Sequence, residues 1–99
     1  MRIPRRIGRV TCDIDSLDEG ALAHAIAVVR QHGFIRDIVF NISSSGNGFH
    51  LVAWHRGRGV FKRRLLKIRE EAGDDPVRIR LDGLGHRQIN VLFTRKVKK

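Results

Sequence analysis

Two kinds of apolar spacing divide this chain of 99 residues into short segments, and together they constrain its fold more than any one motif does. Apolar residues at every second position predict strands, whereas apolar residues three or four positions apart predict amphipathic helices. Val10, Cys12 and Ile14 show the first pattern, with polar residues at the positions between them. Because such a strand has one apolar and one polar face, the sequence predicts a sheet covered by helices on one side.

The predicted elements follow the order strand, helix, strand, strand, helix, strand, with one further strand near the end of the chain. Strands are predicted at Ile7–Asp15, Asp37–Ser43, Phe49–His55, Val77–Asp82 and Gln88–Phe93, and helices from about Leu17 to Gly33, after a capping box of Ser16 and Glu19, and from Phe61 to Gly73. This order is typical of an α+β protein with the ferredoxin-like, or RNA-recognition-motif, βαββαβ sandwich, here with an extra C-terminal strand. In that topology an antiparallel sheet carries two helices on one face, the first and third strands are neighbours, and the fourth lies beside the first.

The charge of the chain predicts a polyanionic partner. Lysine and arginine number 20 against 10 aspartates and glutamates, a formal charge of +10, and residues 1–99 are interpreted as one domain with a basic tail at about 94–99. No apolar stretch approaches the roughly 20 residues that span a bilayer, so a membrane partner is not expected. The N-terminus lacks a secretory signal and Cys12 is the single cysteine, so we expect a cytoplasmic protein, in the host cytoplasm if it is viral. The absence of tyrosine excludes mechanisms with a tyrosyl nucleophile.

Three aspartates are predicted to meet on the sheet face that the helices leave open. Asp13 and Asp15 are two positions apart on the first strand, and Asp82 ends the strand predicted beside it. Carboxylates in this arrangement can share hard divalent cations such as Mg²⁺ or Mn²⁺, and such a site suits phosphoryl transfer. The alternative is that Asp13 and Asp15 end a strand and cap the next helix, and that Asp82 is a turn residue.

The connection between the second and third strands is rich in small residues and is followed by a histidine. Ser45, Gly46, Asn47 and Gly48 allow backbone N–H groups and hydroxyls to approach an anion, and His50 could contact a triphosphate. The loop is not a Walker loop, since it has no lysine and no helix after it. The alternative is an ordinary hairpin with Asn47 and Gly48 as the turn pair, and a surface histidine.

Three segments resemble the motifs of the archaeo-eukaryotic primase superfamily, which includes the primase-polymerases. Val10–Asp15 looks like its Asp-x-Asp strand end, Ser45–His50 like its Ser-Gly-x-Gly-x-His loop, and Arg78–Asp82 like its hydrophobic strand that ends in aspartate. Order and approximate spacing agree over about residues 10–93. Catalytic members usually carry an additional N-terminal α/β module, and many add a zinc-binding element, for which this chain has neither the length nor the cysteines.

The resemblance implies a primase-like nucleotidyltransferase that joins nucleotides on a nucleic-acid template during DNA replication. It implies that Asp13, Asp15 and Asp82 bind Mg²⁺ or Mn²⁺, and that Ser45 and His50 contact the phosphates of the incoming nucleoside triphosphate. A second copy of the chain or a second replication subunit is an expected partner. DNA, including single-stranded DNA, is the expected template, and the residues expected to contact it are Arg56, Arg58, Lys62, Arg63, Arg87, Arg95, Lys96, Lys98 and Lys99.

Two other classes of protein compete with this interpretation. A non-catalytic recognition-motif module would bind single strands by stacking bases on aromatic residues of the sheet. Of the sheet aromatics, Trp54 is expected on the open face, whereas Phe49 should point to the core. A genome-packaging protein would explain the charge but not the cluster of acids.

Overall fold

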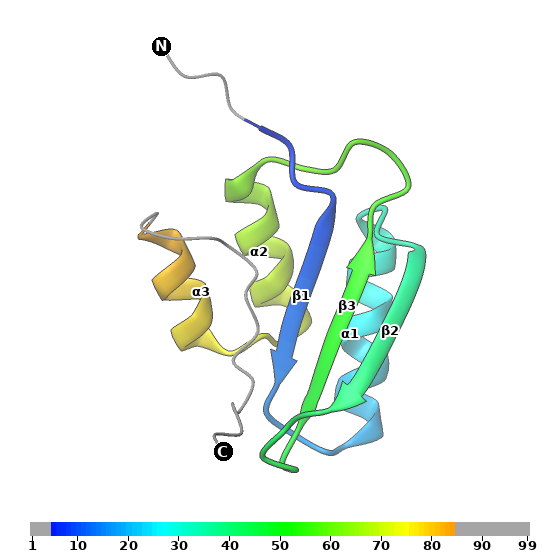
Figure 1. The fold of residues 1–99 in the computed structure, drawn as a ribbon, viewed down its shortest axis with the longest axis vertical. Helices are drawn as coiled ribbons and strands as arrows, with labels where there is room; N and C mark the ends of the chain where they lie inside the picture. Colours follow the sequence, from blue (N-terminus) through cyan, green and yellow to red (C-terminus); the bar gives the residue numbers. More distant parts are fainter. Residues whose placement is uncertain (1–4, 85–99) are drawn as a thin grey trace, which may run out of the picture.

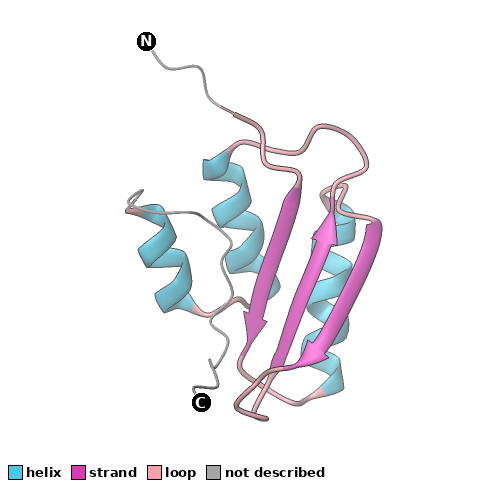
Figure 2. Ribbon diagram, viewed as in Figure 1, coloured by secondary structure: helices cyan, strands magenta, loops and turns pink. Residues whose placement is uncertain are grey.

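The computed structural model describes residues 5–84, which form an α+β domain with an antiparallel sheet and three helices (Figure 1 and Figure 2). The elements are β1 (Arg9–Ile14), α1 (Glu19–Gln31), β2 (Arg36–Ile42), β3 (Phe49–Trp54), α2 (Lys62–Ala72) and α3 (Pro76–Gly83). The described strands follow the order β1-β3-β2, so the predicted pairing of the first and third strands is confirmed. The strand predicted at Gln88–Phe93 and the basic tail lie outside the described residues.

The register of the sheet gives it one apolar face. Cys12 lies opposite Leu51, and Leu51 lies opposite Phe40, so apolar positions of neighbouring strands point to the same side. Helices α1 and α2 cover this side (Figure 1), and the buried core there includes Val10, Cys12, Ile14, Leu22, Ala25, Val28, Val29, Phe34, Phe49, Leu51, Ala53, Leu65, Ile68 and Ala72. Burial raises the pKa of the Cys12 thiol to about 12, as expected for a buried apolar residue and not for a reactive cysteine.

Helix α1 begins later than predicted. Asp18, and not Ser16, is the N-cap residue: its side chain accepts a hydrogen bond from the Gly20 N–H, while the Ser16 hydroxyl accepts one from the Asp18 N–H. Two polar side chains in succession therefore accept hydrogen bonds from backbone N–H groups around the start of the helix, which begins at Glu19. The predicted end is confirmed, since Gly33 follows the helix with a φ of +92°.

The strand predicted at 77–82 is wrong, because residues 76–83 form helix α3. Pro76 stands at the start of the helix, where its missing N–H costs nothing, and Asp75 caps it by accepting a hydrogen bond from the Val77 N–H. Two of its three predicted core residues face outward, with Val77 58% and Leu81 48% exposed, and Ile79 is half-buried. Arg78 is buried instead. The alternation of apolar and polar residues in the sequence therefore predicted the wrong side chains to be buried.

A network of buried ion pairs explains why charged residues point inward here. The Asp74 carboxylate accepts hydrogen bonds from Arg69 Nε at 2.6 Å and from Arg78 Nη1 at 2.6 Å. Arg78 also donates to the Thr11 hydroxyl at 2.6 Å, and Arg69 donates to Asp82 at 2.6 Å. Burial alone would lower the pKa of the Arg69 guanidinium, but the neighbouring Asp74 and Asp82 carboxylates raise it above its ordinary value.

The same network occupies the outer edge of β1. The Asp13 N–H donates to the Asp74 carboxylate at 2.7 Å, and the Asp75 N–H donates to the Asp13 carbonyl at 3.1 Å. These groups take the hydrogen bonds that a fourth strand would otherwise make beside this part of β1. The segment from Asp74 to Arg78 therefore stands where the sequence predicted a strand.

Candidate functional site

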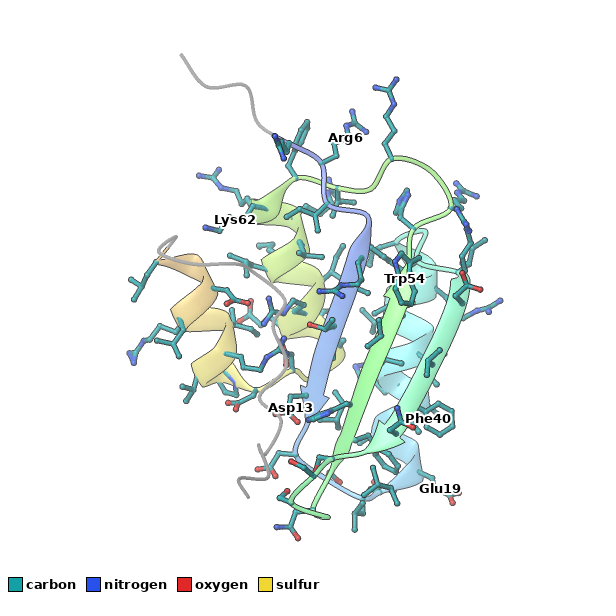
Figure 3. All side chains as sticks on the ribbon, in the orientation of Figure 1. Arg6, Asp13, Glu19, Phe40, Trp54 and Lys62 are labelled. Carbon is teal, nitrogen blue, oxygen red and sulfur yellow. The ribbon has the colours of Figure 1, made fainter. Side chains whose placement is uncertain are left out.

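A cavity of about 230 Å³ lies where β1 ends and the loop between β2 and β3 begins. Asp13, Asp15, Ser45, Gly48 and His50 line it, together with Ile14, Ser43, Ser44 and Asp75. Figure 3 labels Asp13 near the lower end of β1, beside the loop that Figure 1 shows below β3. The fold therefore brings the first two predicted motifs together around one cavity, although residues 16–44 separate them in the sequence.

Asp13 and His50 line this cavity and are cross-strand partners on β1 and β3. His50 Nε2 lies 3.5 Å from Asp13 Oδ1, and the His50 side chain is only 10% exposed. Within the described residues this buried nitrogen has no hydrogen-bond partner. Because a buried polar atom without a partner costs about 1–3 kcal/mol, a ligand that bonded to His50 would recover that free energy.

The surroundings of Asp13 disfavour its charge. Burial raises the pKa of the Asp13 carboxyl, and the nearby Asp74 and Asp75 carboxylates raise it further, against the opposite effect of His50 and Arg78. A bound cation would stabilise the ionised form of the same carboxyl. Perturbed carboxyls in cavities are common at functional sites, so this property favours Asp13 as a functional residue.

The loop between β2 and β3 is ordered by its own serine hydroxyls. The Gly46 N–H donates to the Ser43 carbonyl at 2.9 Å, and Gly46 has a φ of +79°, which favours glycine. Ser45 Oγ lies 3.1 Å from Ser43 Oγ and accepts a hydrogen bond from the Asn47 N–H at 3.3 Å. The reversal is thus a turn from Ser43 to Gly46, and Asn47 is an exposed residue outside the cavity lining.

Gly48 has a structural role that the sequence did not reveal. A Cβ atom at this position would overlap the carbonyl oxygen of Ile14, so only glycine lets the loop pack directly on the end of β1. This contact places the loop hydroxyls beside Asp13 and Asp15. Gly48 therefore shapes the site through backbone packing.

The structure does not bring Asp82 to the cavity. Asp82 lies on α3 and accepts a hydrogen bond from Arg69 at 2.6 Å, so its position on a sheet strand was predicted wrongly. Asp75 lies at the cavity instead, joined to β1 by the hydrogen bond from its N–H to the Asp13 carbonyl. The signal for Asp75 was its place before Pro76, which is typical of an N-cap at a chain reversal.

The donor set suits a cation that is bound together with a phosphate ligand. In residues 5–84, no three histidine, cysteine, aspartate or glutamate side chains are arranged to hold a metal ion by themselves. Mg²⁺, however, is usually held by one or two carboxylates plus the phosphates of a substrate. Asp13 and Asp15 offer such oxygens at one cavity, next to serine hydroxyls and a histidine.

The described basic residues of the predicted template contacts lie at the other end of the sheet. Arg56 and Arg58 are exposed in the connection after β3, and Lys62 and Arg63 begin α2. Figure 3 labels Lys62 near the upper end of α2, far along the domain from Asp13. The other predicted contacts, Arg87, Arg95, Lys96, Lys98 and Lys99, lie outside the described residues. No helix in the described part of the chain is long and apolar enough to cross a membrane.

No protein-family model matches the sequence, and no significant match to a curated protein or to a solved structure was found. The function proposed below therefore depends on the residues and geometry of this chain.

Proposed function

We propose that this chain is a primase-like nucleotidyltransferase domain that binds a nucleoside triphosphate together with Mg²⁺ or Mn²⁺ at the cavity between β1 and the β2–β3 loop. The observation that carries the proposal is the meeting of Asp13, Asp15, Ser45 and His50 around one cavity. The strand order β1-β3-β2, with α1 and α2 on one face, is compatible with the ferredoxin-like layout of such domains.

Each group at the cavity has a role that its chemistry allows. The buried His50 Nε2 would donate a hydrogen bond to a phosphate oxygen, which removes the cost of leaving it without a partner. The Asp13 and Asp15 carboxylates would hold the cation, and the hydroxyls of the loop would donate to the triphosphate. When bound, the cation would neutralise the triphosphate and favour ionisation of the attacking 3′-hydroxyl.

The structure changes the predicted set of carboxylates. Asp82 is engaged by Arg69, so we propose that the charge of Asp75, which lines the cavity, supports cation binding by Asp13 and Asp15 without Asp75 being a ligand. Asp75 Oδ1 accepts a hydrogen bond from the Val77 N–H at 2.9 Å, which orients its side chain at the start of α3. Asp75→Asn should therefore weaken cation binding, whereas Asp82→Asn should mainly lower stability.

Calorimetry with Mn²⁺ and a non-hydrolysable triphosphate tests the proposal on the full chain. We expect joint binding in the wild type and none in Asp13→Asn/Asp15→Asn, while His50→Ala should weaken triphosphate binding by about 1–3 kcal/mol. The control Glu19→Gln/Asp37→Asn removes two exposed charges outside the cavity and should bind normally. Equal affinity in the wild type and the cavity variant would refute the site.

A second function, non-catalytic binding of single-stranded nucleic acid, is favoured by one observation. Trp54 is 37% exposed on the face of the sheet that α1 and α2 do not cover, and its cross-strand partners are Arg9 and Arg36. An aromatic ring between cations suits stacking of a base next to a phosphate. Metal-independent oligonucleotide binding that Trp54→Ala abolishes, with no metal-dependent incorporation of labelled nucleotide, would favour this function over the first.

A further inference from the structure

A second cavity, of about 500 Å³, lies on the helix side of the domain, along α2 from Phe61 to Glu71 and beside His32 at the C-terminal end of α1. Its volume is within the usual range for ligand sites, roughly 300–1,000 Å³. Arg63, Arg64 and Lys67 line it from α2, and Glu71 is its one carboxylate among the described lining residues. None of these residues belongs to the cavity of Asp13 and His50.

The charge of this lining is only partly compensated. The Glu71 carboxylate lies 3.2 Å from His32 Nε2, so its oxygen already has a partner at the C-cap of α1. Arg63, Arg64 and Lys67 are exposed cations on the same helix. Cations gathered in a hollow raise the local concentration of anions there, which predicts a polyanionic ligand.

An aromatic ring stands beside these cations. Phe61 lines the cavity and is 46% exposed, and the guanidinium carbon of Arg6 lies 4.9 Å from the centre of its ring. Buried Ile68 adds an apolar part to the same lining. Nucleic-acid bases stack on exposed aromatic rings while cations bind the backbone phosphates, whereas inorganic anions would not use the apolar part.

We propose that this cavity binds single-stranded nucleic acid, with a base stacked on Phe61 and phosphates held by Arg63, Arg64 and Lys67. This cavity is then a second binding site, separate from the site at Asp13. It predicts that the two sites can be inactivated independently. Asp13→Asn/Asp15→Asn should therefore leave binding at this cavity unchanged.

We expect the cations at the start of α2 to be dispensable for folding. Lys62, Arg63 and Arg64 occupy the first turn of α2, where no acidic residue is present and the N-cap Phe61 makes no side-chain hydrogen bond. Cations at a helix N-terminus oppose the helix dipole. A variant with neutral residues at these positions should therefore melt at the wild-type temperature or above it.

The test measures binding of labelled oligothymidylate to the full chain as a function of salt concentration. In Arg63→Gln/Arg64→Gln/Lys67→Gln, the slope of log affinity against log salt should become shallower by about 2, since each phosphate contact on a single strand contributes about 0.7. The matched control Arg5→Gln/Arg30→Gln/Arg80→Gln removes the same charge from exposed positions outside the cavity and should change the slope by less than half as much. Phe61→Leu should weaken binding roughly 5- to 150-fold.

Three results would overturn the proposal. The first is an equal change of slope in the two triple variants, which would mean diffuse attraction to the whole basic surface. The second is wild-type affinity in Phe61→Leu, which would exclude stacking. The third is loss of binding to anionic vesicles, but not to the oligonucleotide, in the cavity variant, which would identify a lipid surface as the ligand.

Discussion

The C-terminal part of the described fold depends on the negative charge of Asp74. Its carboxylate is fully buried and accepts hydrogen bonds from Arg69, Arg78 and the backbone N–H groups of Asp13 and Asp75. In Asp74→Asn the amide has one acceptor oxygen where the carboxylate has two, and it brings a donor towards an arginine. The buried Arg78 guanidinium also loses the Asp74 charge, while Arg69 keeps the Asp82 carboxylate at 2.6 Å.

The cost of this substitution follows from the burial of the pair. Removing one partner of a buried ion pair typically costs about 3–5 kcal/mol, because the remaining charge stays buried without compensation. Domains of this size have a total free energy of unfolding of about 5–15 kcal/mol. At about 4–8 °C of melting temperature per kcal/mol, Asp74→Asn should lower the melting temperature by roughly 12 °C or more.

Urea unfolding followed by circular dichroism and by the fluorescence of Trp54, the single tryptophan, measures this loss. Glu70→Gln is the matched control, because it removes a carboxylate from an exposed position of α2. We expect Glu70→Gln to change stability by less than about 0.5 kcal/mol. A loss below about 1 kcal/mol in Asp74→Asn would refute the buried network and, with it, the packing of α3 against α2 with Arg78 reaching Thr11 of β1.

Three further predictions follow from the site and the core. Burial raises the pKa of Asp13, so the protonated carboxyl stabilises the fold; this contribution is present below the ordinary pKa of aspartate and is lost as pH rises through the raised value. In thermal melts across pH, Asp13→Asn should not show this loss, and at neutral pH it should melt no lower than the wild type. Gly48→Ala should destabilise the fold by about 1 kcal/mol or more and weaken triphosphate binding, because its methyl group meets the Ile14 carbonyl; unchanged values of both would contradict the packing described. Cys12, with a pKa of about 12, should react with a thiol reagent only as fast as the protein opens, so fast labelling of the native protein would contradict its burial.

The sequence predicted β1, α1 and α2, whose apolar residues are buried, and also β2, whose Val39, Phe40 and Ile42 are exposed. Val10, Cys12 and Ile14 face the core, as their alternation indicated, and Gly33 and Gly73 follow the ends of α1 and α2. These predictions succeeded because burial of apolar area is the dominant favourable term in folding.

The prediction failed where ion pairs were buried instead. In residues 76–83 the apolar positions alternate as in a strand, but the buried Arg78 and the paired Asp82 are four positions apart, which is the spacing of one helix face. Asp75 followed by Pro76 is typical of the N-cap and the first position of a helix, and this signal was present in the sequence. Charged residues are rarely buried without partners, and the partners Arg69 and Asp74 could not be identified without the fold.

Of the residues predicted for the site, Asp13, Asp15, Ser45, Gly48 and His50 line one cavity, whereas Gly46, Asn47 and Asp82 do not. Asp13 and His50 lie on adjacent strands, so strand pairing alone brings them together. The position of Asp75 depends on the turn between α2 and α3 and on the ion pairs of Asp74, which no spacing in the sequence specifies.

The most direct test of the proposed site is paramagnetic broadening of amide NMR signals by Mn²⁺, measured in the full chain with a non-hydrolysable nucleoside triphosphate. Bound Mn²⁺ broadens the signals of residues closest to it, so the measurement locates the ion without requiring activity. We predict the strongest broadening at Asp13, Asp15, Ser45, Gly48 and Asp75, and its loss in Asp13→Asn/Asp15→Asn. Broadening that centres on the exposed acids of α2, or that stays unchanged in this variant, would contradict the proposed site.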